Sequence, residues 1–224
     1  MSSLATLIHL LRLASPALPV GAYSYSQGLE AAIESGEVRD APSARRWIAD
    51  ALSLSVAGME APVFLRLVAA WEAGDGSAAA RWNDEFVASR EAAELRAETL
   101  QMGYSLRKLL LEMDPQGAEL LEAIDDLSFP AAFAFAASRH GIDPREALAA
   151  YLFSWVENQA LAALKAIPLG QTDGQRLVAE VSATIPAIVE RAASMADDEL
   201  CNFAPGIALA SSRHETQYSR IFRS

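Results

Sequence analysis

The chain has 224 residues, of which 52% are hydrophobic and 21% charged, and its formal net charge is −11. This length suffices for one domain with a sizeable core. Because so acidic a body repels phosphate backbones, the charge argues against a nucleic-acid partner. Cys201 is the single cysteine, which excludes an internal disulfide and favours a reducing compartment, the cytoplasm.

The N-terminal segment is predicted to form a helix over residues 3–14, because its apolar side chains recur at helical spacing. A secretory signal peptide is the alternative interpretation of this segment. It is disfavoured because the segment lacks a basic start and carries Arg12 inside its apolar stretch. The longest uncharged stretch, residues 13–29, contains two prolines and two glycines and cannot cross a membrane. We therefore expect no membrane-spanning segment.

Helical periodicity, broken by proline and glycine, predicts an all-α single-domain bundle of about ten helices. The most regular stretch is 91–113, where apolar residues form one face and charged residues, including Glu94 and Glu98, lie largely off it. A helix over 144–167 is apolar nearly all round, which places it in the centre of the bundle. Further helices are expected at 28–35, 42–52, 62–73, 77–86, 130–138 and, with a bend at Pro186, 171–195.

Motifs for catalysis or metal binding are missing from the sequence. The histidines His9, His140 and His214 are far apart, and no Cys-x-x-Cys, His-Glu-x-x-His or Gly-Lys occurs. Cys201 and His214 could form a catalytic dyad, but an inert thiol is the favoured interpretation. We predict no catalytic residue, no metal site and no bound cofactor, and therefore a protein that is not an enzyme.

The proline- and glycine-rich loop at residues 15–30 calls for an explanation. Its prolines stiffen it, its glycines permit positive φ, and Tyr23 and Tyr25 add amphipathic rings. From the residues alone it is either a connector between helices whose tyrosines cap the core, or a functional surface. The first interpretation is favoured on composition.

Polar residues at 155–159 interrupt the apolar helix, with Glu157 and Asn158 among them. Buried amides and carboxylates are costly unless they are paired, at about 1–3 kcal/mol for a neutral group. We expect a satisfied internal network that fixes the helix register. The alternatives are a catalytic acid at Glu157 or a small-molecule pocket beside Gln159.

The C-terminal segment from Ser211 reverses the charge of the rest, because it carries three arginines and one glutamate. The expected organisation is an all-helical domain over 1–210 and a basic tail over 211–224. The tail combines arginines with aromatic residues, which suits a protein interface. A frayed, solvated terminus is an equally weighted alternative.

Four of these segments, in the same order, resemble the family of the urease accessory protein UreF. They are LPVGAYSYSQGLE (18–30), SREAAELRAETLQMGYSL (89–106), WVENQALAALKAIPLGQTDGQRL (155–177) and SSRHETQYSRIFRS (211–224). The likeness extends over nearly the whole chain. Four such segments in register are a specific signal.

The resemblance implies a cytoplasmic, dimeric, all-helical protein that serves nickel insertion into apo-urease. Such proteins bind the accessory protein UreD, also called UreH, and recruit the GTPase UreG. The role is either that of a non-catalytic scaffold or that of an activator or checkpoint of the UreG GTPase, acting through an exposed arginine. Direct nickel binding to this chain is left open, with His9, His140, His214 and Cys201 as candidates in principle.

The resemblance also implies a set of partner-binding residues in two segments. They are Tyr23, Tyr25, Gln27, Glu30, Arg213, His214, Glu215, Tyr218, Arg220, Phe222 and Arg223. The tail is expected to become ordered on binding UreD and to be dispensable for folding of the helical domain. Which partner contacts the Tyr23–Glu30 segment is left open.

Overall fold

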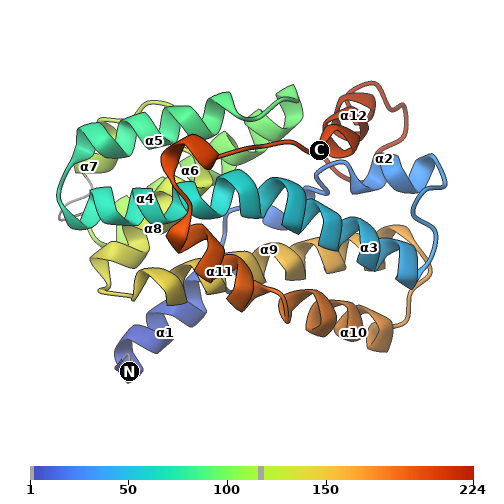
Figure 1. The fold of residues 1–224 in the computed structure, drawn as a ribbon, viewed down its shortest axis with the longest axis horizontal. Helices are drawn as coiled ribbons and strands as arrows, with labels where there is room; N and C mark the ends of the chain where they lie inside the picture. The colour runs from blue at the N-terminus through green and yellow to red at the C-terminus, as the bar shows by residue number, and fades with distance from the viewer. Residues whose placement is uncertain (1–2, 116–118) are drawn as a thin grey trace.

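Helices make up every regular element of the computed structural model, which describes residues 3–115 and 119–224. Three short elements are 3₁₀-helices at Ala22–Ser24 and Asp197–Glu199 and a π-helix at Leu52–Glu60. The α-helices are α1 Leu4–Leu13, α2 Leu29–Glu34, α3 Ala41–Ala51, α4 Ala61–Glu72, α5 Gly76–Ala88, α6 Ala93–Met113, α7 Glu119–Glu122, α8 Phe129–Arg139, α9 Pro144–Ala166, α10 Gln171–Ser182, α11 Ile185–Ser194 and α12 Pro205–His214. The predicted all-α single-domain fold is confirmed (Figure 1).

Capping residues set the beginnings of several helices. Asp40 accepts a hydrogen bond from the Ser43 N–H at 3.0 Å and completes a capping box that starts α3. Asp143 accepts from the N–H groups of Arg145 and Glu146 and starts α9. These acceptors satisfy N–H groups that have no partner inside the helix.

The predicted break between helices at 42–52 and 62–73 is wrong, because α3, the π-helix and α4 form one continuous helix from Ala41 to Glu72. Pro62 has no N–H, so the carbonyl of Gly58 lacks its α-helical donor. That carbonyl accepts the N–H of Cys201 at 3.0 Å instead. The wider π turn, closed by the Ala61 N–H on the Val56 carbonyl, lets the helix continue past the proline.

This joined helix has the length and composition of a membrane span, with a mean hydropathy of 1.5 in its most apolar window. However, 72% of that window is buried inside the bundle, as in core helices that pass the same test. Its apolar character is therefore explained by packing.

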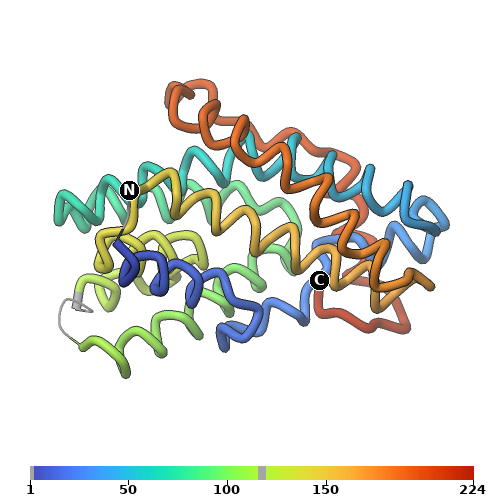
Figure 2. The backbone as a smooth tube through the Cα atoms, turned by 90° about the horizontal axis from the view of Figure 1, so that it is seen from below, coloured from blue at the N-terminus to red at the C-terminus, as the bar shows by residue number. Residues whose placement is uncertain are grey.

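The core lies where α4, α8 and α9 meet, with α6 on the far side of α8 (Figure 1). Phe64, Phe133 and Tyr151 form an aromatic cluster there, with ring centroids 5.0 to 5.8 Å apart. Gly103 lets α6 approach closely, since a Cβ at this position would lie 2.0 Å from the Leu127 carbonyl oxygen. In contrast, α1 projects from the edge of the bundle in Figure 1 and lies across its lower face in Figure 2.

The last part of the chain returns across the bundle. The helix expected at 171–195 is two helices, α10 and α11, separated at Ala183 and Thr184. A strap over residues 195–204 then crosses the π-helix and leads to α12, which the sequence did not predict. The boundary expected at 210/211 falls inside α12, which lies beside α2 (Figure 1).

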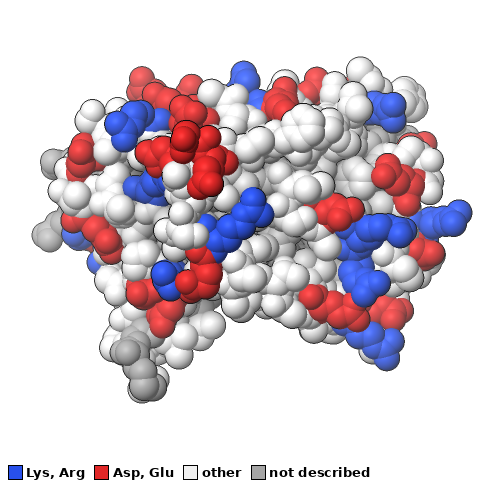
Figure 3. Space-filling view, in the orientation of Figure 1, with Lys and Arg blue, Asp and Glu red and all other residues white. Residues whose placement is uncertain are grey.

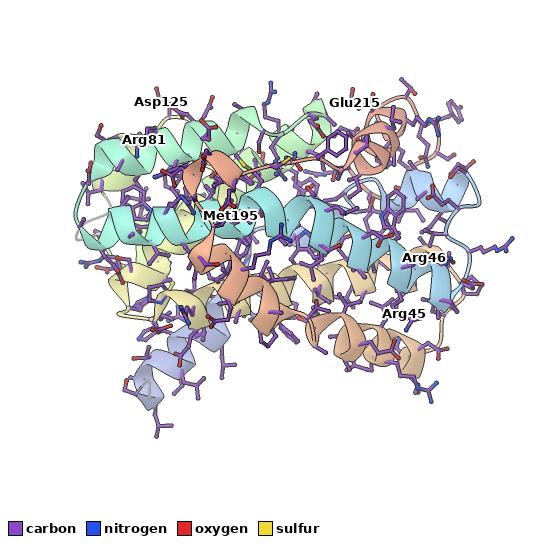
Figure 4. All side chains as sticks on the ribbon, in the orientation of Figure 1. Arg45, Arg46, Arg81, Asp125, Met195 and Glu215 are labelled. Atoms are coloured by element: carbon purple, nitrogen blue, oxygen red, sulfur yellow. The ribbon has the colours of Figure 1, made fainter. Side chains whose placement is uncertain are left out.

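Charges are scattered over the face in Figure 3, with basic groups gathered at the end where α3 and α10 meet. Figure 4 places Arg45 and Arg46 at this end. Arg45 donates to Glu180 at 2.6 Å and joins α3 to α10, but both side chains are about half exposed. This patch is balanced locally and is not a uniform basic surface.

Candidate partner-binding site

The two segments implied as partner-binding lie against each other. The Arg223 N–H donates to the Ser24 carbonyl at 2.8 Å, and the Ser26 N–H donates to the Ser224 carbonyl at 2.8 Å. The carboxylate of Glu30 accepts the N–H groups of Ile221, at 2.6 Å, and Phe222, at 2.9 Å. The tail is thus docked on its own chain, which differs from the expectation of a segment that orders on binding a partner.

His214 is buried between two carboxylates. Its Nδ1 lies 2.6 Å from Glu94 Oε2 and its Nε2 lies 3.0 Å from Glu30 Oε2. A neutral imidazole has only one N–H, so two hydrogen bonds to carboxylates require either an imidazolium or a protonated carboxyl group. Arg220 donates to the other oxygen of Glu94 at 2.6 Å. These groups fasten the end of α12 to α2 and α6.

Glu98 lies one turn further along α6 and receives the last residue of the tail. Its two oxygens accept from Gln27 Nε2 and from Ser224 Oγ, each at 2.7 Å. Burial raises the pKa of Glu98 to about 7, because desolvation of the charged form outweighs these hydrogen bonds. A proton on Glu98 therefore lets it stay inside the protein near neutral pH.

A strained backbone conformation in the loop at residues 15–30 positions the side chain that contacts Glu98. Gln27 has a φ of 53°, a left-handed value that non-glycine residues rarely adopt. Its side chain bridges Glu98 and Trp155, accepting from Trp155 Nε1 at 2.8 Å. Gly28 follows with a φ of 81°, and a Cβ there would lie 2.9 Å from Ser211 Oγ. The glycine thus allows α12 to pack directly on the loop.

The two tyrosines of the loop differ in exposure. Tyr25 is buried, and burial raises the pKa of its hydroxyl, with the charge of Glu98 adding to the effect and contact with Arg223 opposing it. Tyr23 is exposed, and the ammonium of Lys165 lies 5.5 Å from its ring and 5.7 Å from the ring of Phe222. Phe222 is the buried aromatic residue of the tail.

The outer face of the tail has no such internal role. The side chain of Tyr218 is fully exposed and that of Ile221 is 64% exposed. Arg213 is exposed as well, and it has no ion pair among residues 3–115 and 119–224. Glu215 accepts the Ala93 N–H at 2.9 Å and caps the beginning of α6 (Figure 4). The implied residues therefore divide into inward anchors and an outward face.

A second buried polar cluster lies deeper in the bundle. Glu60, at the end of the π-helix, accepts the hydroxyl of Tyr151 and lies 3.5 Å from Arg90 Nη1. The hydrogen bond, the charge of Glu60 and desolvation together keep the pKa of Tyr151 well above its usual range, desolvation most of all. A cavity of about 90 Å³ separates this cluster from the loop after α1.

The polar residues of α9 are partly paired, as expected. Trp155 donates to Gln27, and Asn158 Nδ2 donates to the Tyr25 carbonyl at 3.2 Å. The expected network is confirmed for these two residues, whereas the buried Nε2 of Gln159 has no hydrogen-bond partner in the described part of the chain. Glu157 and Asn158 line the cavity, whose walls are mostly apolar.

The candidate nucleophile is not placed beside a base, and of the candidate metal ligands only His9 and His140 lie together. Both nitrogens of His214 face carboxylates, so this histidine is not available as a base for Cys201, which is exposed on the strap. His9 stacks on His140 with ring centroids 3.8 Å apart, at the contact of α1 with the end of α8. Over the residues that the structure describes, no group of three or more histidine, cysteine, aspartate or glutamate side chains is arranged so that it could hold a metal ion.

Sequence reasoning missed Glu94 and Glu98 as site residues, because it placed them on the solvated side of an amphipathic helix. Their spacing of four residues puts both on one face of α6. That face is covered by a tail more than 120 residues further along the chain. The only signal in the sequence was that both fall within one of the four family-like segments.

Comparison with known proteins assigns this architecture to a family. The UreF family model matches residues 38–182. A urease accessory protein UreF from Azoarcus sp. (strain BH72) is 56% identical and covers 99% of this chain and 97% of its own. Proteins of the same name from Methylobacillus flagellatus and Dechloromonas aromatica are 52% and 50% identical over the full length of both chains. This similarity includes the loop and the tail that form the site, and the chain belongs to the UreF family of urease accessory proteins.

Proposed function

We propose that this chain is a non-catalytic scaffold for nickel insertion into apo-urease, and that it binds UreD (UreH) and recruits UreG. The observation that carries the proposal is the composite surface in which the tail is docked on the Tyr23–Glu30 segment. Its inward contacts hold the shape, and its outward face offers exposed aromatic and cationic groups of the kind found at interface hot spots. The name of the relatives, urease accessory protein UreF, supports the biological setting.

The outer face of the tail is the proposed contact with UreD. Tyr218 and Arg213 are exposed, have no structural partner among the described residues and stand on an anchored backbone, so little conformational entropy remains to be lost on binding. Tyr23 is exposed near Phe222 of the tail, since the Lys165 ammonium lies close to both rings, and it is the proposed contact with a second partner, UreG.

Co-purification with UreD tests this assignment. Tyr218→Ala combined with Arg213→Ala is expected to abolish capture of UreD without lowering the thermal stability of the chain. The matched control is Tyr104→Ala combined with Arg45→Ala, which removes another exposed tyrosine and another exposed arginine. Capture that survives the first pair, or is lost equally with the second, contradicts the proposal.

A regulator of the UreG GTPase is the second candidate function, favoured by the exposed and unpaired guanidinium of Arg213. An arginine of this kind can stabilise the charge that develops in phosphoryl transfer. The rate of GTP hydrolysis by UreG is to be compared in three samples: UreG alone, UreG with the unaltered chain, and UreG with the Arg213→Ala chain. A change in turnover that depends on Arg213 supports an activator or checkpoint, whereas unchanged turnover supports the scaffold alone.

We further propose a cytoplasmic homodimer. Four apolar side chains of α1 are 42–80% exposed, namely Leu4, Leu7, Ile8 and Leu11. Phe153 and Leu161 on the neighbouring α9 are partly exposed as well. Such a face is typical of a protein interface. Sedimentation of the purified chain tests the dimer. Nickel is treated as the cargo of the complex, and no resident nickel site on this chain is part of the proposal.

A further inference from the structure

Two buried hydrogen-bond donors line a second cavity, of about 20 Å³, which adjoins the larger one at Trp155 and is called the small cavity here. The donors are Arg90 Nε and Gln159 Nε2, and neither has an acceptor among residues 3–115 and 119–224. Because Arg90 and Gln159 are only 7% and 2% exposed, bulk water does not reach them freely. An unsatisfied buried donor is costly, and a charged one more so. Two such donors on one wall therefore indicate that the small cavity holds an acceptor.

The guanidinium group of Arg90 is only loosely held by its neighbours. Its Nη1 lies 3.5 Å from Glu60 Oε2 and its Nη2 lies 3.4 Å from Ser89 Oγ, both longer than the usual separation of about 2.9 Å. One face of the group lies over the ring of Phe86, 4.4 Å from its centroid. Glu60 also accepts the hydroxyl of Tyr151, so its charge is shared between two donors. The cation therefore retains the capacity to bind a further anionic acceptor.

The rest of the wall favours an anion over a cation. No aspartate or glutamate lines the small cavity within the described part of the chain. Gln27 Oε1 already accepts from Trp155 Nε1 at 2.8 Å, and the Ser55 hydroxyl donates to Asn202 Oδ1 at 2.7 Å. The other lining residues are apolar, namely Ala51, Val56, Leu95 and Ile207. A cationic donor and an amide donor on such a wall match a negatively charged acceptor.

The size of the small cavity restricts its occupant to a single atom or a water molecule. One water needs about 10–15 Å³ of such space, and a chloride ion is only slightly larger than a water. Sulfate and phosphate are too large. A water accepts from both donors, but it brings no charge to the guanidinium, and hydrogen bonds between charged groups are about twice as strong as neutral ones. Chloride therefore fits both the size and the charge of the site.

We propose that the small cavity is a binding site for one monovalent, halide-sized anion, chloride, held by Arg90 Nε and Gln159 Nε2. Arg90 lies between α5 and α6, and Gln159 lies on α9. The π-helix and α12 complete the wall through Val56 and Ile207. The anion thus joins elements that are distant in the sequence and stabilises the folded chain. The proposal goes beyond the proposed function and does not rest on it.

Thermal unfolding at constant ionic strength is the first test. The unaltered chain is melted in sodium gluconate, an anion too large for the small cavity, and gluconate is then replaced stepwise by chloride. A ligand that binds only the folded chain raises the melting temperature by an amount set by its concentration and its dissociation constant. At ten times its dissociation constant, chloride should raise the melting temperature of a chain of this size by roughly 3–6 °C. A melting temperature that does not respond to chloride overturns the proposal.

Substitutions of Gln159 separate a bound anion from a general effect of salt. Gln159→Glu places a carboxylate on the wall that Arg90 shares, so chloride should no longer raise the melting temperature of this variant. Gln159→Leu removes one of the two donors and should weaken the apparent affinity for chloride about tenfold. Gln101→Leu, at an exposed glutamine of α6, is the control and should respond like the unaltered chain. An equal response in all four chains overturns the proposal.

Bromide identifies the occupant directly and requires only the unaltered chain. In crystals grown from sodium bromide, a peak of anomalous scattering should lie within hydrogen-bonding distance of Arg90 Nε and Gln159 Nε2. Density without an anomalous signal assigns the small cavity to a water and overturns the proposal, and so does an empty cavity. Neither UreD nor UreG is present in these experiments, so their failure leaves the proposed function untouched.

Discussion

Replacement of Glu98 by glutamine should make the stability of the chain less dependent on pH. The raised pKa of Glu98, about 7 against the ordinary 4.5, means that the folded chain keeps this proton at pH values where the unfolded chain has lost it. Its contribution to stability is therefore complete below pH 4.5 and falls as the pH rises to 7. The full difference amounts to about 3 kcal/mol, since one pKa unit corresponds to about 1.4 kcal/mol.

Chemical unfolding followed by circular dichroism measures this effect between about pH 5.5 and 8.5. The stability difference between Glu98→Gln and the unaltered chain should grow in favour of the variant by about 2 kcal/mol over this range. Glutamine still accepts from Gln27 and can donate to the Ser224 hydroxyl, so packing is retained. Glu112→Gln, an exposed position on the same helix, is the control. Stability curves that stay parallel for Glu98→Gln would refute the reasoning.

Three further substitutions test contacts of the site and of the surrounding fold. Gly28→Ala should lower the free energy of unfolding by about 2 kcal/mol in a thermal assay, because it adds a positive-φ penalty and a clash with Ser211. Gly36→Ala is the control, since Gly36 has a φ of 78° but open space around it, and it should lower the free energy of unfolding by about half as much. Gly58→Ala places a Cβ 2.4 Å from the Cys201 carbonyl oxygen, so limited proteolysis should cleave the strap about tenfold faster while the helical circular dichroism persists. Arg45→Ala should change the melting temperature very little, because an exposed ion pair contributes about 0.5 kcal/mol.

The long helices were predictable from the sequence because their signals are local. An apolar face at spacings of three and four residues predicted a helix over 91–113, and α6 spans Ala93–Met113. Asp143 followed by Pro144 predicted the beginning of α9, where the aspartate caps the helix and the proline occupies its first turn. In α6 the residues that form the apolar face, such as Met102 and Leu106, are also buried in the core.

The errors occur where a distant segment completes the local structure. Pro62 is a helix breaker by its own chemistry, but the Cys201 N–H takes up the carbonyl that the proline leaves free. Similarly, the buried residues of α12 are Ala210, Ser211 and His214, which give no apolar stripe, and its packing on Gly28 depends on the loop near the other end of the chain. No window of sequence contains either interaction.

The candidate site, like the fold, was predictable only where its signals are local. Family-like segments indicated both the loop and the tail, but they did not indicate that the two segments bind each other. Glu94 and Glu98 looked like solvated charges, because charges off the apolar face of a helix usually are. Glu98 is buried and Glu94 is partly buried, because His214, Arg220 and Ser224 lie against them. The role of these two carboxylates depends on the position of the tail, which sequence periodicity cannot predict.

This dependence changes what a deletion of the tail would report. The sequence suggested that removing residues 213–224 would leave the helical domain folded and abolish only UreD binding. In the structure the same deletion removes the donors of Glu30 and Glu94 and uncovers Glu98, so part of its effect would be loss of stability. Loss of partner binding after truncation would then have two causes that cannot be told apart. Substitutions at Tyr218 and Arg213, which touch no inward contact, separate recognition of the partner from folding of the site.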